Sequence, residues 1–202
     1  MQKQEVLARV DHTILKPTST WEDVKQILTE ALENKTASAC IPPSYVKRAK
    51  EEFPTLTICT VIGFPLGYST KGTKFFEARE AVQNGADEID MVVNLGLVKD
   101  GDFLGVAEEI RAVKKACQGK LLKVIVETCY LTEDEKIALC KAVTDAGAEF
   151  IKTSTGFGTA GAELGDMKLF RQHIGANVKI KASGGIRTKE DIEAFIEAGA
   201  DR

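Results

Sequence analysis

The stretch Ala146-Gly147-Ala148-Glu149-Phe150-Ile151 joins the end of a predicted helix to the start of a predicted strand. The same phrase occurs earlier as Asn84-Gly85-Ala86-Asp87-Glu88-Ile89 and again as Ala198-Gly199-Ala200-Asp201-Arg202. Glycine is the expected stop of a helix, and the residues after it turn the chain back into a sheet. A junction that recurs in this way indicates repeated units of helix and strand.

Short apolar runs alternate with amphipathic segments along the whole chain. The runs at 58–62 and 121–126 are nearly continuous in apolar residues, as expected for parallel strands that are covered on both faces. The strand candidates are about 10–15, 37–41, 57–63, 88–93, 121–127, 149–154 and 178–183.

Helix starts between these strands are marked by a hydroxyl residue followed three positions later by an acidic one. Ser19 with Glu22 and Thr132 with Glu135 are two such capping boxes, and apolar residues at helical spacing follow both. Residues 2–9 predict a short helix before the first strand.

Strands that alternate with helices require a parallel sheet with right-handed crossovers. Because no Gly-x-Gly-x-x-Gly turn follows the first strand, a TIM (β/α)8 barrel is favoured over a doubly wound sheet. Seven strands are visible and the eighth has no counterpart, so we expect the natural barrel to continue past Arg202. No linker rich in Pro, Gly or Ser interrupts the chain. Residues 1–202 therefore predict a single α/β TIM-barrel domain that is C-terminally incomplete.

The composition is that of an ordinary globular protein, with 44% hydrophobic and 28% charged residues. A net charge of −3 gives no basic footprint for nucleic acid or an anionic membrane. No apolar run approaches the roughly 18 residues of a transmembrane helix. We expect a cytoplasmic protein with a small-molecule substrate, and a homo-oligomer is an open alternative to a monomer.

The five cysteines are scattered and form no Cys-x-x-Cys pair, so neither a disulfide framework nor a zinc knuckle is predicted. The two histidines, His12 and His173, lie far apart in the sequence. We therefore expect no metal site and no metal-dependent chemistry.

Lys152 and Lys181 each interrupt an apolar segment that otherwise predicts a buried strand. A buried ammonium is costly, and two lysines at the same end of adjacent strands would repel each other. Both effects lower the pKa of an amine, and a neutral amine is the nucleophile that Schiff-base chemistry needs. The alternative is that each lysine reaches the surface or forms an ion pair with Asp or Glu.

Other polar residues fall at the carboxyl ends of the predicted strands, where a barrel has its active site. They include Asp11, Thr13, Cys40, Asp90, Asn94, Glu127, Ser154 and Ser183. Each has a structural alternative. Asp90 could be a counter-ion for a lysine, and Cys40 a small core residue. Glu127 and Lys123 could form a structural ion pair or be hydrogen-bonded barrel residues, and His12 could pack or bond locally.

Two glycine-bearing loops follow the lysine strands, namely Ser154-Thr155-Gly156-Phe157-Gly158 and Ser183-Gly184-Gly185-Ile186. Glycine lets backbone N–H groups approach an anion closely, and the N-terminus of a following helix favours negative charge. A ligand that bears a phosphate is the natural expectation.

The chain resembles the deoxyribose-phosphate aldolases, a family of class I aldolases with a TIM-barrel fold. The resemblance rests on the segments 11–17, 59–67, 88–92, 123–128, 150–157 and 180–186, which are spread over nearly the whole chain. It implies reversible cleavage of 2-deoxy-D-ribose 5-phosphate to D-glyceraldehyde 3-phosphate and acetaldehyde, without a metal or an organic cofactor.

The resemblance also implies roles for individual residues. Lys152 corresponds to the Schiff-base lysine, and Lys181 and Asp90 to the residues that transfer protons. Gly156, Gly184 and Gly185 correspond to positions around the substrate phosphate, and Thr155 and Ser183 of the same two loops are further candidate contacts. A Schiff-base barrel enzyme for another sugar phosphate and a non-catalytic sugar-phosphate binder are the two alternatives.

Overall fold

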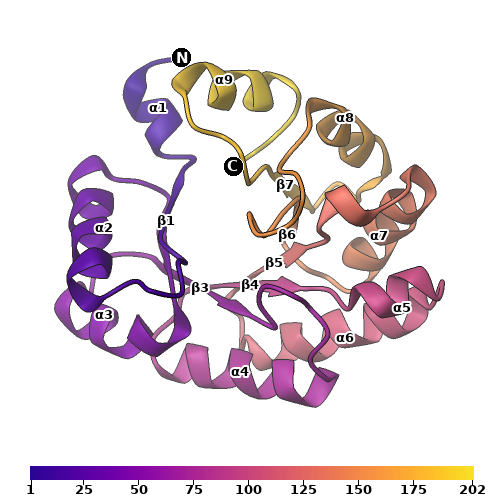
Figure 1. Cartoon of the computed structure of the whole chain (residues 1–202), viewed down its shortest axis with the longest axis horizontal. Coiled ribbons are helices and arrows are strands. Elements are labelled where there is room, and N and C mark those ends of the chain that lie inside the picture. Colours follow the sequence, from indigo (N-terminus) through magenta and orange to yellow (C-terminus); the bar gives the residue numbers. More distant parts are fainter.

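The computed structural model describes residues 1–202, and its seven strands form one parallel sheet in sequence order (Figure 1). The strands are β1 (Asp11–Thr13), β2 (Ser38–Ile41), β3 (Ile58–Ile62), β4 (Glu88–Val92), β5 (Leu121–Ile125), β6 (Phe150–Lys152) and β7 (Lys179–Lys181). Every predicted strand is present, and all seven are shorter than predicted. The sheet is curled, as in a TIM barrel, so the predicted fold class is confirmed.

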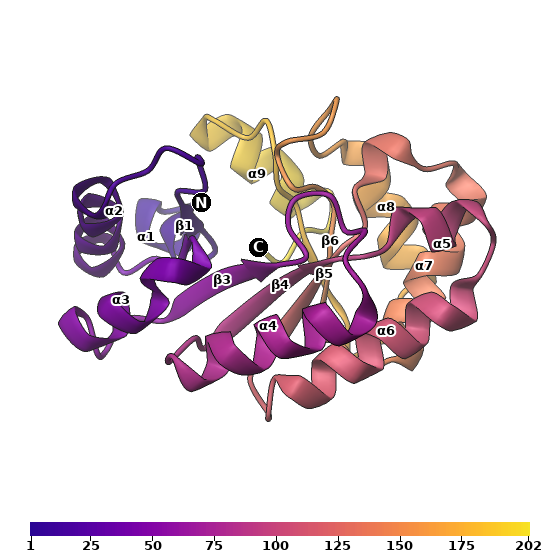
Figure 2. The same cartoon turned by 60° about the horizontal axis from the view of Figure 1, so that its bottom comes forward.

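Helices cover the outer face of the curled sheet, as Figures 1 and 2 show. They are α1 (Lys3–Leu7), α2 (Trp21–Asn34), α3 (Val46–Glu52), α4 (Lys71–Gln83), α5 (Leu95–Lys99), α6 (Phe103–Ala116), α7 (Glu133–Asp145), α8 (Leu164–His173) and α9 (Lys189–Glu197), with 3-10 turns at Pro43–Tyr45 and Thr128–Tyr130. No helix combines the length and the apolar character needed to cross a membrane.

The predicted capping boxes are present, but that of α2 lies one residue later in the sequence than predicted. Thr132 and Glu135 form the expected capping box of α7. Helix α2 starts one residue later than predicted, because Thr20 and Asp23 form its capping box rather than Ser19 and Glu22. The Thr20 N–H donates to the Asp23 carboxylate at 2.8 Å, and the Asp23 N–H donates back to the Thr20 hydroxyl at 3.3 Å.

The two edges of the sheet are β1 and β7. The last two residues run alongside β7, since the Arg202 N–H donates to the Ile180 carbonyl and the Ala182 N–H donates to the Arg202 carbonyl. Helices α1 and α9 also come together, and the N-terminal ammonium lies 2.7 Å from the Glu193 carboxylate. The ends of the chain therefore lie near each other (Figure 1).

The strands separate an apolar outer layer from a charged interior. Ile89, Met91 and Val93, in and just after β4, join the apolar core of 40 buried residues between sheet and helices. Glu88 and Asp90 alternate with them and are buried on the inner face of the curled sheet, which we call the lumen. Period-two alternation thus directs the polar residues of each strand toward one enclosed space.

A buried ion pair outside the lumen fixes the end of β4. The ammonium of Lys74 on α4 lies 2.9 Å from the Glu109 carboxylate on α6 and 2.9 Å from the Val92 carbonyl. The Asn94 N–H also donates to Glu109, at 3.2 Å. Burial lowers the pKa of Lys74, and the Glu109 charge opposes that shift. The pair ties two helices to the backbone that follows Asp90.

Glu109→Ala should therefore lower the free energy of unfolding by about 3–5 kcal/mol, because it leaves a buried ammonium without a counter-ion. The neighbouring Glu108 is the matched control: its side chain is 64% exposed and pairs with Lys71 at 3.5 Å. Glu108→Ala should cost no more than about 1 kcal/mol. Urea unfolding of both variants measures the difference, and equal losses would contradict a structural role for the buried pair.

Candidate active site

The two lysines that the sequence singled out are direct neighbours in the sheet. Lys152 of β6 and Lys181 of β7 are opposite each other in the parallel register, and both side chains are buried. The two ammonium groups pair with different carboxylates. Lys152 Nζ lies 2.7 Å from Asp90 Oδ2, and Lys181 Nζ donates to Asp11 Oδ2. The ion-pair alternative is thus realised for both lysines inside the lumen.

Asp11 links β1 to β7 across the open edges of the sheet. It accepts from Lys181, and its other oxygen accepts from the Ser38 hydroxyl at 2.9 Å. Arg202 lies 3.4 Å from the same oxygen. Burial alone would raise the pKa of Asp11, but the charges of Lys123, Lys181 and Arg202 hold it well below its usual range.

Lys123 of β5 is the central cation of the lumen and is fully buried. Its ammonium lies 2.7 Å from Asp90 Oδ1, 2.7 Å from Glu88 Oε2 and 3.5 Å from Asp11 Oδ2. Burial lowers the pKa of Lys123, but these carboxylates raise it well above its ordinary value. Lys123 does not pair with Glu127, so that suggested ion pair is absent.

Asp90 lies between two ammonium groups, those of Lys123 and Lys152. Burial would raise the pKa of Asp90, but the charges of the surrounding lysines lower it below its usual range. Asp90 is therefore a carboxylate that is held ionised and contacts the candidate nucleophile directly.

The expected depression of the Lys152 pKa is wrong for this arrangement. Burial does lower the pKa of Lys152, but the charge of Asp90 and its hydrogen bond outweigh burial and raise it. The lysine that opposes this shift is Lys123 rather than Lys181, whose ammonium is occupied by Asp11. The sequence shows that two lysines are adjacent but not how close their carboxylates lie.

A cavity of about 400 Å³ opens onto the two lysines. Candidate residues Asp11, Thr13, Thr155, Gly156, Ser183 and Gly184 line it together with Lys152 and Lys181. Gly185 and Cys40 do not line this cavity, although Gly185 is the next residue of the same loop. The two glycine-bearing loops after β6 and β7 therefore share one cavity with the lysines.

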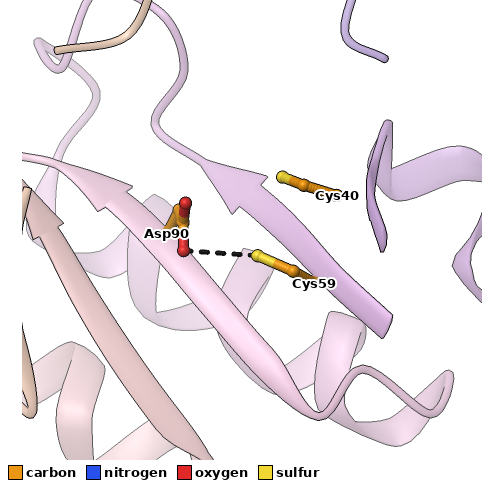
Figure 3. Close-up of side chains that lie close together, drawn as sticks. All are labelled: Cys40, Cys59 and Asp90. Carbon is orange, nitrogen blue, oxygen red and sulfur yellow. Dashed lines mark hydrogen bonds between the residues drawn. The ribbon is translucent and has the colours of Figure 1, made fainter. Parts of the chain in front are cut away.

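Cys40 and Cys59 are brought together by the pairing of β2 with β3 (Figure 3). Cys59 Sγ lies 3.3 Å from Asp90 Oδ1 and 3.2 Å from Lys123 Nζ. Burial, the contact with Cys40 and the charge of Asp90 raise the pKa of Cys59 well above its ordinary value. Cys59 is not among the site residues predicted from the sequence, because it lies within a strand rather than at a strand end. The alternation of side chains along β3 is the signal that places it in the lumen.

Glu127 is a hydrogen-bonded structural residue, the second of the two alternatives that the sequence left open for it. Its carboxylate accepts from the Thr155 N–H at 3.1 Å and from the Thr155 hydroxyl, and the Phe157 N–H donates to that hydroxyl at 3.0 Å. Glu127 adopts a left-handed backbone conformation with φ 54°. A residue just after β5 thus holds the loop that follows Lys152.

Two further polar candidates lie away from the lysines. His12 bonds locally, since its Nε2 lies 2.7 Å from Glu30 on α2. Asn94 caps α5 by accepting from the Gly96 N–H at 3.0 Å.

Comparisons with known proteins agree with this geometry. The sequence matches the DeoC/LacD family of aldolases over residues 5–200. It is 58% identical to a deoxyribose-phosphate aldolase of Clostridioides difficile (strain 630), over 98% of this chain and 91% of that protein. The chain belongs to this aldolase family.

Solved structures give the same result. The aldolase QR15 is 38% identical with a TM-score of 0.94, over 98% of this chain and 90% of that one. A tetrameric deoxyribose phosphate aldolase from Aeropyrum pernix is 31% identical with a TM-score of 0.91, over 99% and 86% of the two chains. The aldolase fold is thus shared over nearly the whole described chain.

If Asp90 raises the pKa of Lys152, Asp90→Asn should lower that pKa, because the largest charge that opposes burial is then removed. Trace acetylation of Lys152 across a pH series, followed by peptide mass mapping, measures it. Asp145→Asn removes an exposed carboxylate that pairs with Lys141 and should leave the Lys152 profile unchanged. An unchanged profile in Asp90→Asn would rule out Asp90 as the group that controls this lysine.

Proposed function

We propose that this chain is a class I deoxyribose-phosphate aldolase that reversibly cleaves 2-deoxy-D-ribose 5-phosphate to D-glyceraldehyde 3-phosphate and acetaldehyde. The observation that carries the proposal is the buried Lys152 ammonium at the end of β6, in contact with Asp90 and open to a cavity lined by glycine-bearing loops. Membership in the aldolase family and the names of the relatives support the substrate.

In the proposed reaction, neutral Lys152 adds to the aldehyde carbon of the open-chain sugar to form a carbinolamine. Loss of water gives an iminium, which accepts the electron pair of the C2–C3 bond when the C3 hydroxyl loses its proton. Glyceraldehyde 3-phosphate leaves. The remaining enamine is protonated at carbon, and water then releases acetaldehyde and the free amine of Lys152.

The charges around Lys152 suit the iminium as well as the ammonium. Both species carry one positive charge on the same nitrogen, 2.7 Å from Asp90 in the resting arrangement. A carboxylate that raises the pKa of Lys152 therefore also stabilises the iminium. Deprotonation of Lys152 costs free energy because it removes the attraction to Asp90. Formation of the iminium restores that attraction.

Asp90 and Lys181 are the proposed proton-transfer groups. Asp90 is an ionised carboxylate and serves as the proton acceptor. Lys181 lies directly opposite Lys152 in the register of β6 and β7 and serves as the proton donor. Lys181 is held by Asp11, so Asp11 positions this donor and supplies its counter-charge. General acid–base groups of this kind contribute about 10²–10⁴-fold to turnover.

The substrate phosphate is assigned to the loops after β6 and β7. Gly156 and Gly184 have φ of 85° and 81°, a region that favours glycine, and both line the cavity. Helix α9 begins soon after the second loop, at Lys189. Thr155 and Ser183 add hydroxyl groups, and Glu127 fixes the first loop through Thr155.

We further propose a cytoplasmic setting and a homo-oligomeric form. The five cysteines are all unpaired, which suits a reducing compartment. The relative from Aeropyrum pernix is described as tetrameric, which supports assembly from identical chains.

Lys152→Arg should abolish turnover, because a guanidinium stays protonated and cannot add to a carbonyl. Borohydride reduction with acetaldehyde should label Lys152 in the parent chain, as peptide mass mapping would show, and should label no lysine in the variant. Labelling of Lys181 or Lys123 in the parent would reassign the nucleophile. Sugar-phosphate binding without any trapping would favour the non-catalytic binder.

Gly184→Ala should weaken recognition of the phosphate, because a Cβ there would lie 3.0 Å from the Gly161 Cα and the backbone has a positive φ. We expect KM for deoxyribose 5-phosphate to rise about tenfold or more, the equivalent of one lost hydrogen bond to a charged group. KM for unphosphorylated deoxyribose should change less. Gly165→Ala, where a Cβ meets no atom within 4 Å, is the control. Equal effects on both sugars would place the phosphate elsewhere.

A further inference from the structure

Two thiols and a carboxylate face one another in the lumen (Figure 3). Cys40 and Cys59 are direct partners in the register of β2 and β3, and Asp90 comes from the next strand. The two sulfur atoms and an Asp90 carboxylate oxygen all lie within 4.8 Å of one another, and all three residues are buried. No residue role proposed above for the aldolase reaction uses the two thiols.

This donor set suits a thiophilic divalent cation. Zinc bonds to thiolate at about 2.3 Å and to carboxylate at about 2.0–2.2 Å in tetrahedral sites, so its donors lie roughly 3.5–4 Å apart. The three atoms lie within 4.8 Å of one another, so they need to close by about 1.3 Å at most to reach that spacing. Hard ions such as Mg²⁺ prefer oxygen ligands and do not match two sulfurs.

The charges of the lumen allow a divalent cation to replace the two thiol protons. Coordination by two thiolates replaces two thiol protons with one divalent cation, so the net charge of the lumen does not change. The Asp90 carboxylate must be shared with the ion, which weakens its contact with Lys123. Lys123 still keeps Glu88 at 2.7 Å and Asp11 at 3.5 Å, so its charge stays compensated.

We propose that Cys40, Cys59 and Asp90 form an inhibitory site for a thiophilic divalent cation such as Zn²⁺ or Cd²⁺. The bound ion shares the Asp90 carboxylate through the oxygen that faces Cys59. It thereby takes up negative charge that the iminium on Lys152 needs from Asp90 as its counter-charge. The inhibitory effect rests on the proposed aldolase function, whereas the metal site itself rests only on the geometry of the three donors.

Binding is tested first, with Cd²⁺ added to the reduced, metal-free chain under anaerobic conditions. The parent chain should bind one tight ion and develop the ultraviolet charge-transfer band of a cadmium–thiolate complex. Cys59→Ser and Cys40→Ser should each weaken that binding more than tenfold, since even changes outside the ligand set cost about 10–100-fold. Cys129→Ser, which removes the one partly exposed thiol, is the control and should bind like the parent.

Activity is tested second, by titrating Zn²⁺ into the aldol cleavage assay. Zn²⁺ should inhibit the parent and Cys129→Ser, a chelator should restore the rate, and Mg²⁺ should have no effect. Cys59→Ser should need more than tenfold more Zn²⁺ for half inhibition. Cys59→Ala provides a second variant if the serine chain unfolds, as thermal unfolding would show.

The two assays separate the metal site from the aldolase reaction. Cadmium binding that depends on Cys40 and Cys59 supports the site even if no sugar phosphate is cleaved. Equal cadmium binding by the parent and both lumen variants would overturn it, as would loss of binding in Cys129→Ser alone. Tight binding without any loss of turnover would overturn the inhibitory role.

Discussion

The Asp90 carboxylate between two buried ammonium groups is the contact on which the rest of the site depends. One oxygen faces Lys123 and the other faces Lys152, each at 2.7 Å. Ions taken out of water need close partners, and removal of one leaves the other uncompensated. Asp11, Glu88 and Arg202 extend the same network to β1 and to the residues beside β7. Charge pairing therefore sets how the strands meet inside the lumen, while apolar packing holds the helices outside.

The network contains one more cation than anion, since Asp11, Glu88 and Asp90 face three lysines and Arg202. Loss of one proton from Lys152 would balance it, and formation of an iminium would restore the resting charge. A raised pKa therefore does not contradict a nucleophilic role for Lys152. The field that makes the free amine scarce stabilises each later cation on the same nitrogen, so the surroundings of Lys152 favour the intermediate as strongly as the resting state.

The fold could be predicted because its signals are local. The glycine that ends α7, the Thr132–Glu135 cap and the apolar run of β5 each act within a few residues. The adjacency of Lys152 and Lys181 follows from strand order alone. The partners of the charges could not be predicted in this way. Whether Lys181 meets Asp11 or Asp90 depends on register and on which strands face each other across the lumen, over a sequence separation of 170 residues. The direction of the Lys152 pKa shift could not be predicted either, because it depends on the short distance between Lys152 and Asp90.

Glu127 shows how the fold couples the two ends of the candidate site. A left-handed conformation in a residue with a side chain costs about 1–3 kcal/mol, and such strain persists only where the surroundings enforce it. Here the left-handed conformation directs the buried Glu127 carboxylate toward Thr155, three residues after Lys152. The loop continues to Gly158, where a Cβ would lie 3.2 Å from the Glu127 carboxyl carbon. The nucleophile and the proposed phosphate loop are thus parts of one short segment, which the Glu127 side chain holds from the loop that follows β5. The spacing between them is therefore set before substrate arrives, which lowers the cost of orienting the sugar for attack.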